Sequence, residues 1–190
     1  MSINLGNIWS KRAKNIRISG QNQAKPASKG RGKAKIRKTN YRSGRARWGP
    51  TTWILFHTIA AKINEEYYKK NYMYVWNFIT EICANLPCPY CRNHAISFTK
   101  NIQPNQINEK HKLIKILFDF HNVANRNANN PLYNWGDMKI YNNTNVLNVF
   151  RNFNSKFFGF YYNHREFSQW IRNSLKESSL QFLNTIIKYC

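Results

Sequence analysis

The chain has 190 residues, of which 42% are apolar and 15% aromatic, so it can bury a core and is not a wholly disordered chain. Its 30 Lys and Arg against 8 Asp and Glu give a net charge of +22, which bears on anionic partners rather than on the fold. Four cysteines are too few for a disulfide scaffold of this length, and no uninterrupted apolar stretch predicts a membrane-spanning helix.

The N-terminal part of the chain carries a disproportionate share of the positive charge. Residues 1–47 hold 14 of the 30 basic residues and no acid, because the first carboxylate is that of Glu65. This segment is also rich in Gly, Ser, Gln and Asn, so we predict a disordered basic tail over residues 1–46. Three roles stay open for it: a solvated extension, weak nucleic-acid contact through phosphates, or a mitochondrial presequence.

From Trp48 onward the apolar residues follow a helical period. Pro50 suits the first turn of the first helix, and Pro87 ends the second. The segment Pro131–Asn145 is predicted as an Asn-rich loop, and Gly159 as the break between the last two helices. The predicted helices cover about Trp48–Asn64, Tyr68–Asn85, Cys88–Lys100, Glu109–Asn127, Val146–Phe158 and Phe167–Tyr189.

This pattern predicts an all-α fold, a four-helix bundle with additional C-terminal helices. We divide the chain into the tail (1–46), the bundle domain (47–140) and a C-terminal helical extension (141–190). Cys83 falls on the inner face of the second helix and is expected to be an inert core thiol.

The sequence Leu-Pro-Cys-Pro-Tyr-Cys over residues 86–91 carries the most chemical information. With Pro89 as the first helical residue, Cys88 is the N-cap and Cys91 lies in the first turn. Unpaired backbone N–H groups and the helix dipole favour a thiolate there, as thiol–disulfide exchange requires.

Three other interpretations of the two cysteines stay open. A structural zinc site would need further ligands, and only His94 lies nearby, so no metal is predicted. A thioredoxin-like domain would place a strand before Cys88, where this sequence predicts a helix. The third interpretation is a plain buried pair.

Two further segments complete a recognisable set with the cysteine pair. Residues 47–58 read RWGPTTWILFHT, residues 88–91 read CPYC, and residues 120–126 read FHNVANR. In order and spacing the three resemble the opening helix, the redox-active disulfide and the H-N-x-x-N motif of the Erv/Alr family of FAD-linked sulfhydryl oxidases. The similarity spans roughly Arg47 to Asp137, and the small size and Asn-rich composition resemble those of the members from large DNA viruses.

The resemblance implies roles for eight residues around non-covalently bound FAD. Cys88 would face the incoming substrate thiolate, and Cys91 would lie against the isoalloxazine ring. The remaining cofactor contacts would come from Gly49, Trp53, His57, His121, Asn122 and Asn125. The pairs Trp53/His57 and His121/Asn125 are each four residues apart, so each pair shares one helix face.

By the same resemblance the protein is expected to form disulfide bonds in thiol-containing protein substrates. Electrons would pass from the reduced Cys88–Cys91 pair to FAD and then to O₂, giving H₂O₂. A homodimer and a location in the cytoplasm or the virion are expected, with a mitochondrial location open. Cys190 is single and would form an intermolecular bond or play no part. The alternative function is a basic nucleic-acid-binding or structural protein with an incidental cysteine pair.

Overall fold

The computed structural model describes residues 34–161 and 168–190, and these residues form helices and no strand. The prediction of an all-α fold is therefore confirmed. The elements are α2 (Ala34–Lys62), α3 (Glu65–Ala84), α4 (Pro89–Thr99), η1 (Pro104–Gln106), α5 (Lys110–Asn127), η2 (Trp135–Asn143), α6 (Val146–Tyr161), α7 (Gln169–Ile186) and η3 (Ile187–Tyr189). None of the described helices is long and apolar enough to cross a membrane.

Helix α2 begins earlier than predicted. Its backbone is helical from Ala34, so residues 34–46 of the predicted tail are helical, and residues 1–33 lie outside the described residues. The segment is rich in Ala, Lys and Arg, which favour helix. Pro50 consequently lies inside α2 rather than in its first turn.

Two side-chain hydrogen bonds lie directly beside Pro50 in α2. Proline removes one donor from the helix ladder. The hydroxyl groups of Thr51 and Thr52 both donate to the carbonyl oxygen of Trp48, at 2.8 and 2.9 Å. These bonds hold the backbone together in the turn where the bundle begins.

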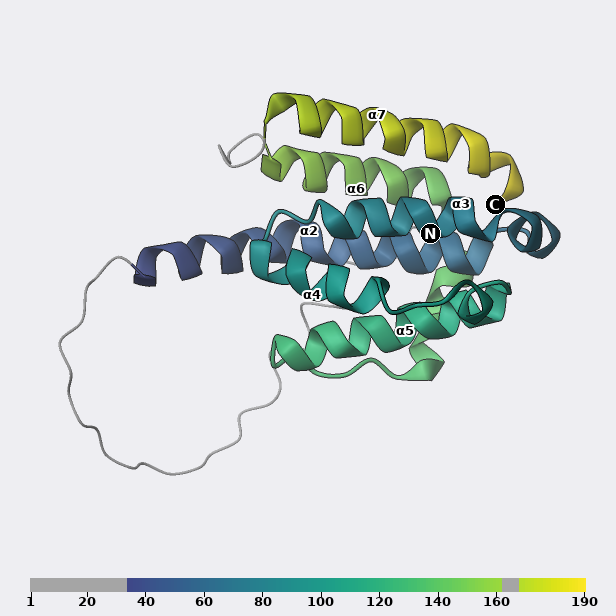
Figure 1. The fold of residues 1–190 in the computed structure, drawn as a ribbon, viewed down its shortest axis with the longest axis horizontal. Coiled ribbons are helices and arrows are strands. Elements are labelled where there is room, and N and C mark those ends of the chain that lie inside the picture. The colour runs from purple at the N-terminus through teal and green to yellow at the C-terminus, as the bar shows by residue number, and fades with distance from the viewer. Residues whose placement is uncertain (1–33, 162–167) are drawn as a thin grey trace.

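The first four helices run back and forth along one long axis (Figure 1). Only two residues join α2 to α3, so α3 runs back alongside α2. The last residues of α3 therefore lie toward the same end of the molecule as the start of α2. Asn64 caps α3 by accepting the N–H of Tyr67 at 2.9 Å. The predicted inner face of α3 is buried, with Ile79, Ile82 and Cys83 each 0% exposed.

The two C-terminal helices pack on the bundle and share its core (Figure 1). Helix α6 lies along α2, where Phe157 meets Trp48 edge to face with ring centroids 6.3 Å apart. Helix α7 covers α3, where Phe78 and Phe182 stack with centroids 3.8 Å apart. Phe150, Phe153, Phe157, Phe158 and Phe182 of the predicted extension therefore belong to the same core as the bundle.

Two predicted boundaries in the C-terminal half are wrong. Helix α6 continues through Gly159 to Tyr161, since glycine weakens a helix without having to end it. The predicted loop Pro131–Asn145 contains η2, which is anchored by Tyr141 at 0% exposure. The Asn-rich composition favoured a loop there, and burial of one large ring outweighed it.

Candidate redox site

The two cysteines of the CPYC motif lie where the sequence predicted, at the start of α4. Cys88 is the N-cap and Pro89 is the first helical residue. The sulfur of Cys88 accepts the backbone N–H of Cys91 at 3.3 Å. A donated N–H at a helix N-terminus stabilises negative charge on the acceptor, so this contact favours a thiolate on Cys88.

The two sulfurs differ in accessibility. Cys88 is only 6% exposed, whereas Cys91 is half-buried. Cys83, the second-last residue of α3, is fully buried, and burial raises the pKa of its thiol far above the ordinary value. The prediction that Cys83 is part of the core is confirmed.

A stacked aromatic cluster joins α2 to α5. The rings of Trp53 and His121 are 4.1 Å apart and nearly parallel, at 7°. His57 stacks against both of them, and its Nε2 lies 2.9 Å from Nδ1 of His121. The structure therefore brings together three of the predicted site residues that are far apart in the sequence.

The same cluster extends to α4 through two phenylalanines. Phe120 packs edge to face on Trp53 with centroids 5.0 Å apart, and it stacks on Phe98 at 4.4 Å. Phe98 lies two turns after Cys91 on the same face of α4. Cys91 and the Trp53 cluster are thus connected along the face of α4 that meets α5.

Both histidines of the cluster are held neutral by burial. Desolvation lowers the pKa of His57 to about 3, from an ordinary value of 6.5. Burial and then the neighbouring His57 hold the pKa of His121 well below its ordinary value. In a neutral pair one nitrogen of the shared hydrogen bond donates and the other accepts.

Two tyrosines that the sequence analysis missed border this histidine pair. Tyr133 stacks on His121 with centroids 5.1 Å apart, and Tyr141 packs on His57 at 4.9 Å. Their hydroxyl groups are 3.2 Å apart. Both belong to the segment predicted as a plain loop, and their spacing of eight residues carried no helical or strand signal that would have revealed them.

Asn122 has a structural partner in the described structure. Its side-chain amide donates to the carbonyl of Tyr133 at 3.2 Å, and its side-chain carbonyl accepts the N–H of Tyr133 at 2.8 Å. Asn122 thereby fixes Tyr133 against α5. The cofactor contact predicted for Asn122 stays a prediction, and the amide is occupied by the Tyr133 backbone.

The last two predicted cofactor residues lie on the same helices. Asn125 is 7% exposed on α5, one turn after His121. Around Gly49, no described atom lies within 4 Å of the position that a Cβ would take. Packing among the described residues therefore does not require glycine there, and its predicted role in close cofactor approach stays a prediction.

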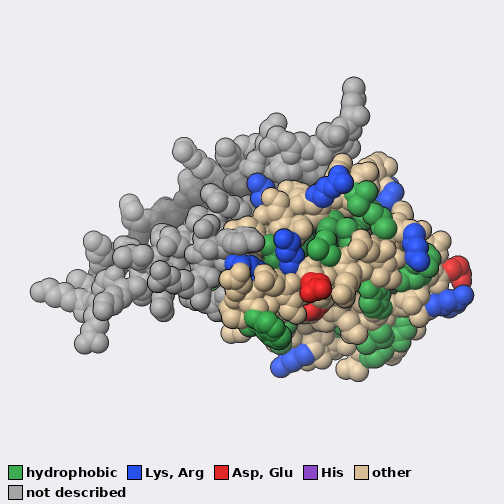
Figure 2. All heavy atoms as spheres, turned by 90° about the horizontal axis from the view of Figure 1, so that it is seen from above, with side chains coloured by type: hydrophobic (Ala, Val, Ile, Leu, Met, Phe, Trp, Pro, Cys, Tyr) green, Lys and Arg blue, Asp and Glu red, His purple; other side chains and the backbone are tan. Residues whose placement is uncertain are grey.

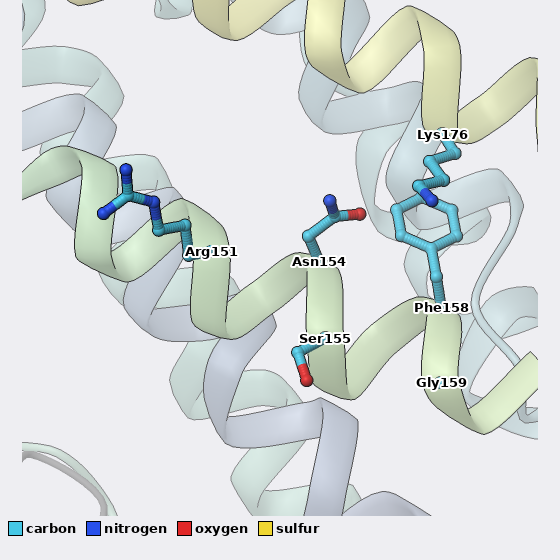
Figure 3. Close-up of a pocket in the computed structure, with 6 residues that line it drawn as sticks. All are labelled: Arg151, Asn154, Ser155, Phe158, Gly159 and Lys176. Carbon is cyan, nitrogen blue, oxygen red and sulfur yellow. The ribbon is translucent and has the colours of Figure 1, made fainter.

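A separate cavity lies between α6 and α7, away from all of these residues. It has a volume of about 320 Å³ and is lined by Arg151, Asn154, Ser155, Phe158, Gly159 and Lys176 (Figure 3). No predicted site residue lines it. Within 34–161 and 168–190, no three His, Cys, Asp or Glu side chains are grouped closely enough to hold a metal ion.

Paired cysteines at a helix start, connected to an aromatic cluster inside a helical bundle, form a site suited to thiol–disulfide redox chemistry. The sequence model of the Erv1 / Alr family matches residues 50–144, which is half of the chain, and the chain belongs to this family. The matched range includes every predicted site residue except Gly49.

Individual viral proteins are also similar to this chain. An African swine fever virus protein (isolate Tick/Malawi/Lil 20-1/1983), named FAD-linked sulfhydryl oxidase, is 29% identical over 113 residues, which cover 59% of this chain and 93% of that protein. A protein of Invertebrate iridescent virus 6, named putative FAD-linked sulfhydryl oxidase 347L, is 30% identical over 91 residues, covering 45% and 82% of the two chains. No solved structure matches the chain.

Proposed function

We propose that this protein is an FAD-dependent thiol oxidase that forms disulfide bonds in protein substrates. The observation that carries the proposal is the Cys88–Cys91 pair at the start of α4, with the Cys91 N–H directed at the Cys88 sulfur. Membership of the Erv1 / Alr family and the names of the viral relatives support it.

The residues of the site fit a flavin cofactor. Trp53 and His121 provide nearly parallel flat rings, and the half-buried Trp53 keeps surface that a planar ring can cover. Nδ1 of His57 is buried with no hydrogen-bond partner among the described residues, so it is available to a polar group of a ligand. We propose that Trp53, His57, His121 and Asn125 hold FAD, with Gly49 and Asn122 at the edge of the site.

The cysteines perform the exchange with substrate. A substrate thiolate attacks the Cys88 sulfur of the Cys88–Cys91 disulfide, so that a mixed disulfide forms and Cys91 leaves as a thiolate. A second substrate thiolate then attacks the substrate sulfur of the mixed disulfide. The substrate disulfide forms, and Cys88 leaves as a thiolate that the N–H of Cys91 stabilises. The cysteine pair has now gained two electrons.

When bound, FAD supplies the two-electron chemistry that connects the reduced cysteine pair to O₂, with H₂O₂ as the product. The buried histidines stay neutral and present directed polar groups without adding charge. Because Cys88 is only 6% exposed, attack on it requires a local opening of the connection between α3 and α4.

Other parts of the proposal depend on the family resemblance alone. We propose a homodimer that acts in the cytoplasm or the virion, with O₂ as electron acceptor. The weak nucleic-acid contact proposed for the basic tail falls largely on residues 1–33, which lie outside the described residues.

Purified full-length protein tests the proposal directly. It is expected to be yellow, to release FAD on denaturation, and to consume O₂ and form H₂O₂ when dithiothreitol is added. Trp53→Ala should lose most of its FAD because the exposed ring surface is removed. Trp135→Ala is the matched control, since Trp135 is 54% exposed and packs only edge-on against Phe118. A colourless wild-type protein without oxidase activity would refute the proposal.

A further inference from the structure

The end of the bundle that carries the cysteine pair also carries the basic start of α2. Helix α2 projects past the ends of the other helices, and α4 starts at that same end (Figure 1). The projecting residues 34–47 are helical and would span about 20 Å at the normal helical rise. They contain six Lys and Arg and no acid.

Helices α4 and α5 add further positive charge there. Asn127, at the end of α5, contacts His94 of α4 at 3.3 Å, so the last turn of α5 lies beside the first turns of α4. Arg92 and Arg126 are the cations of these turns. From the last turn of α3 through α4, Glu81 is the only acid, and its carboxylate accepts a hydrogen bond from Ser178 at 2.7 Å.

An exposed aromatic residue lies between the two cysteines. Tyr90 is 57% exposed and packs edge-on against His94 with ring centroids 4.3 Å apart. It offers an incoming chain a flat apolar surface directly beside Cys88 and Cys91. On the face seen from above, Lys and Arg side chains lie among apolar and polar side chains (Figure 2).

From this juxtaposition we infer that the redox end binds acidic, cysteine-bearing protein segments as substrates. The inference rests on the proposed oxidase function and names its substrate class. The basic extension of α2 attracts the acidic flanks of the segment, and Tyr90 contacts the chain next to the reacting cysteine. A nucleic acid would also be attracted by this charge, but it carries no thiol and gains nothing from a place beside the cysteines.

The test compares two charge variants of the full chain. The triple variant Lys38→Gln, Arg42→Gln, Arg45→Gln removes three charges from the projecting start of α2, residues 34–47. The matched control Lys69→Gln, Lys70→Gln, Lys110→Gln removes three charges at the opposite end, near the start of α3 and of α5. Each variant oxidises a dithiol peptide flanked by glutamates, the same peptide flanked by glutamines, and dithiothreitol.

We expect kcat/KM of the extension variant for the acidic peptide to fall about 10-fold in low salt, because steering by a charged surface raises association rates by at least that factor. High salt should remove the difference from wild type. Oxidation of the glutamine peptide and of dithiothreitol should be unchanged, and the control variant should resemble wild type. Tyr90→Ser should raise KM for both peptides and leave the salt dependence intact.

Equal rates of wild-type protein on the two peptides, or an equal loss in the control variant, would overturn the inference. So would a variant that loses affinity for a double-stranded oligonucleotide while its peptide kinetics stay unchanged, which would make nucleic acid the partner. If wild-type protein does not oxidise dithiothreitol, the proposed oxidase function itself fails, and the two failures are thus distinguishable.

Discussion

At one end of the bundle the sulfur of Cys88 accepts a backbone N–H from the first turn of α4. At the other end, Cys190 follows Tyr189, whose ring stacks on Tyr67 at 3.7 Å and whose carbonyl accepts the N–H of Asn64 at 2.6 Å. Burial raises the pKa of the Cys190 thiol to about 11, even though Lys110 and Lys62 oppose that shift.

The comparison shows that the surroundings of a thiol decide its chemistry. Two nearby lysines do not compensate for the burial of Cys190. Cys88 is buried as well, but its sulfur accepts a backbone N–H at a helix start, a contact that favours a thiolate. The two ends are separated by the length of α3, which is 20 residues or about 30 Å. Cys190 therefore cannot exchange with Cys88 of its own chain without leaving its place in the fold.

Replacing either cysteine of the pair should have the largest effect. Cys88→Ser and Cys91→Ser each break the exchange, so dithiothreitol oxidation should fall by more than about 1,000-fold. Serine is a good N-cap, so Cys88→Ser should keep the start of α4 and the bound FAD. Oxygen consumption and the flavin spectrum measure the two effects separately. Turnover within ten-fold of wild type in either variant would contradict the assigned roles.

Much of this arrangement could be predicted from the sequence, because its signals are local. The helical period of the apolar residues predicted the buried face of α3, and the position of Pro89 predicted Cys88 as the N-cap. The resemblance carried by the three motifs predicted that Trp53 and His121 belong to one site. The hydrogen bond from the Cys91 N–H to the Cys88 sulfur follows from that N-cap position, because an N-cap side chain accepts an N–H of the first turn.

Tertiary contacts explain the parts that the sequence did not reveal. The half-buried Tyr133 and the buried Tyr141 pack on histidines from other helices, and the residue spacing of their own segment does not predict these contacts. Helix α2 continues through Pro50, and beside it the hydroxyl groups of Thr51 and Thr52 donate to the carbonyl of Trp48. In each case packing or side-chain hydrogen bonding outweighed a correct local preference.

Hydrogen bonds that α5 makes near the candidate redox site can be removed without replacing a cysteine. Asn122→Ala removes both hydrogen bonds that hold the Tyr133 backbone, and it should lower the free energy of unfolding by about 1–3 kcal/mol. Asn127→Ala removes only an exposed contact to His94 and should cost less than about 0.5 kcal/mol. Urea unfolding of both variants measures the difference. Equal stabilities would mean that Asn122 does not fix Tyr133.

The neutral pair of His57 and His121 predicts that the free energy of unfolding depends on pH. The folded protein keeps His57 neutral down to about pH 3, while the unfolded chain binds a proton below about pH 6.5. Stability is therefore full above pH 6.5 and falls as the pH decreases, by up to about 1.4 kcal/mol per pH unit for each histidine. Thermal unfolding of the FAD-free protein between pH 7 and 5 measures the slope.

The variant His57→Phe keeps a ring in the stack and should give a flatter pH profile. His111→Gln is the control, because the His111 side chain is 69% exposed, and its profile should match wild type. If wild type and His57→Phe lose the same stability between pH 7 and 5, His57 is not a source of the pH dependence.

The smallest effect is expected at Cys190. Cys190→Ser should change dithiothreitol oxidation less than two-fold, because this thiol lies a helix length away from Cys88 and carries little thiolate near neutral pH. In reduced protein, iodoacetamide at pH 8 should label Cys190 much more slowly than an unfolded control, and mass spectrometry of the C-terminal peptide measures the rate. A large loss of turnover in Cys190→Ser would show that the two ends exchange electrons between chains, since the fold keeps them apart within one chain.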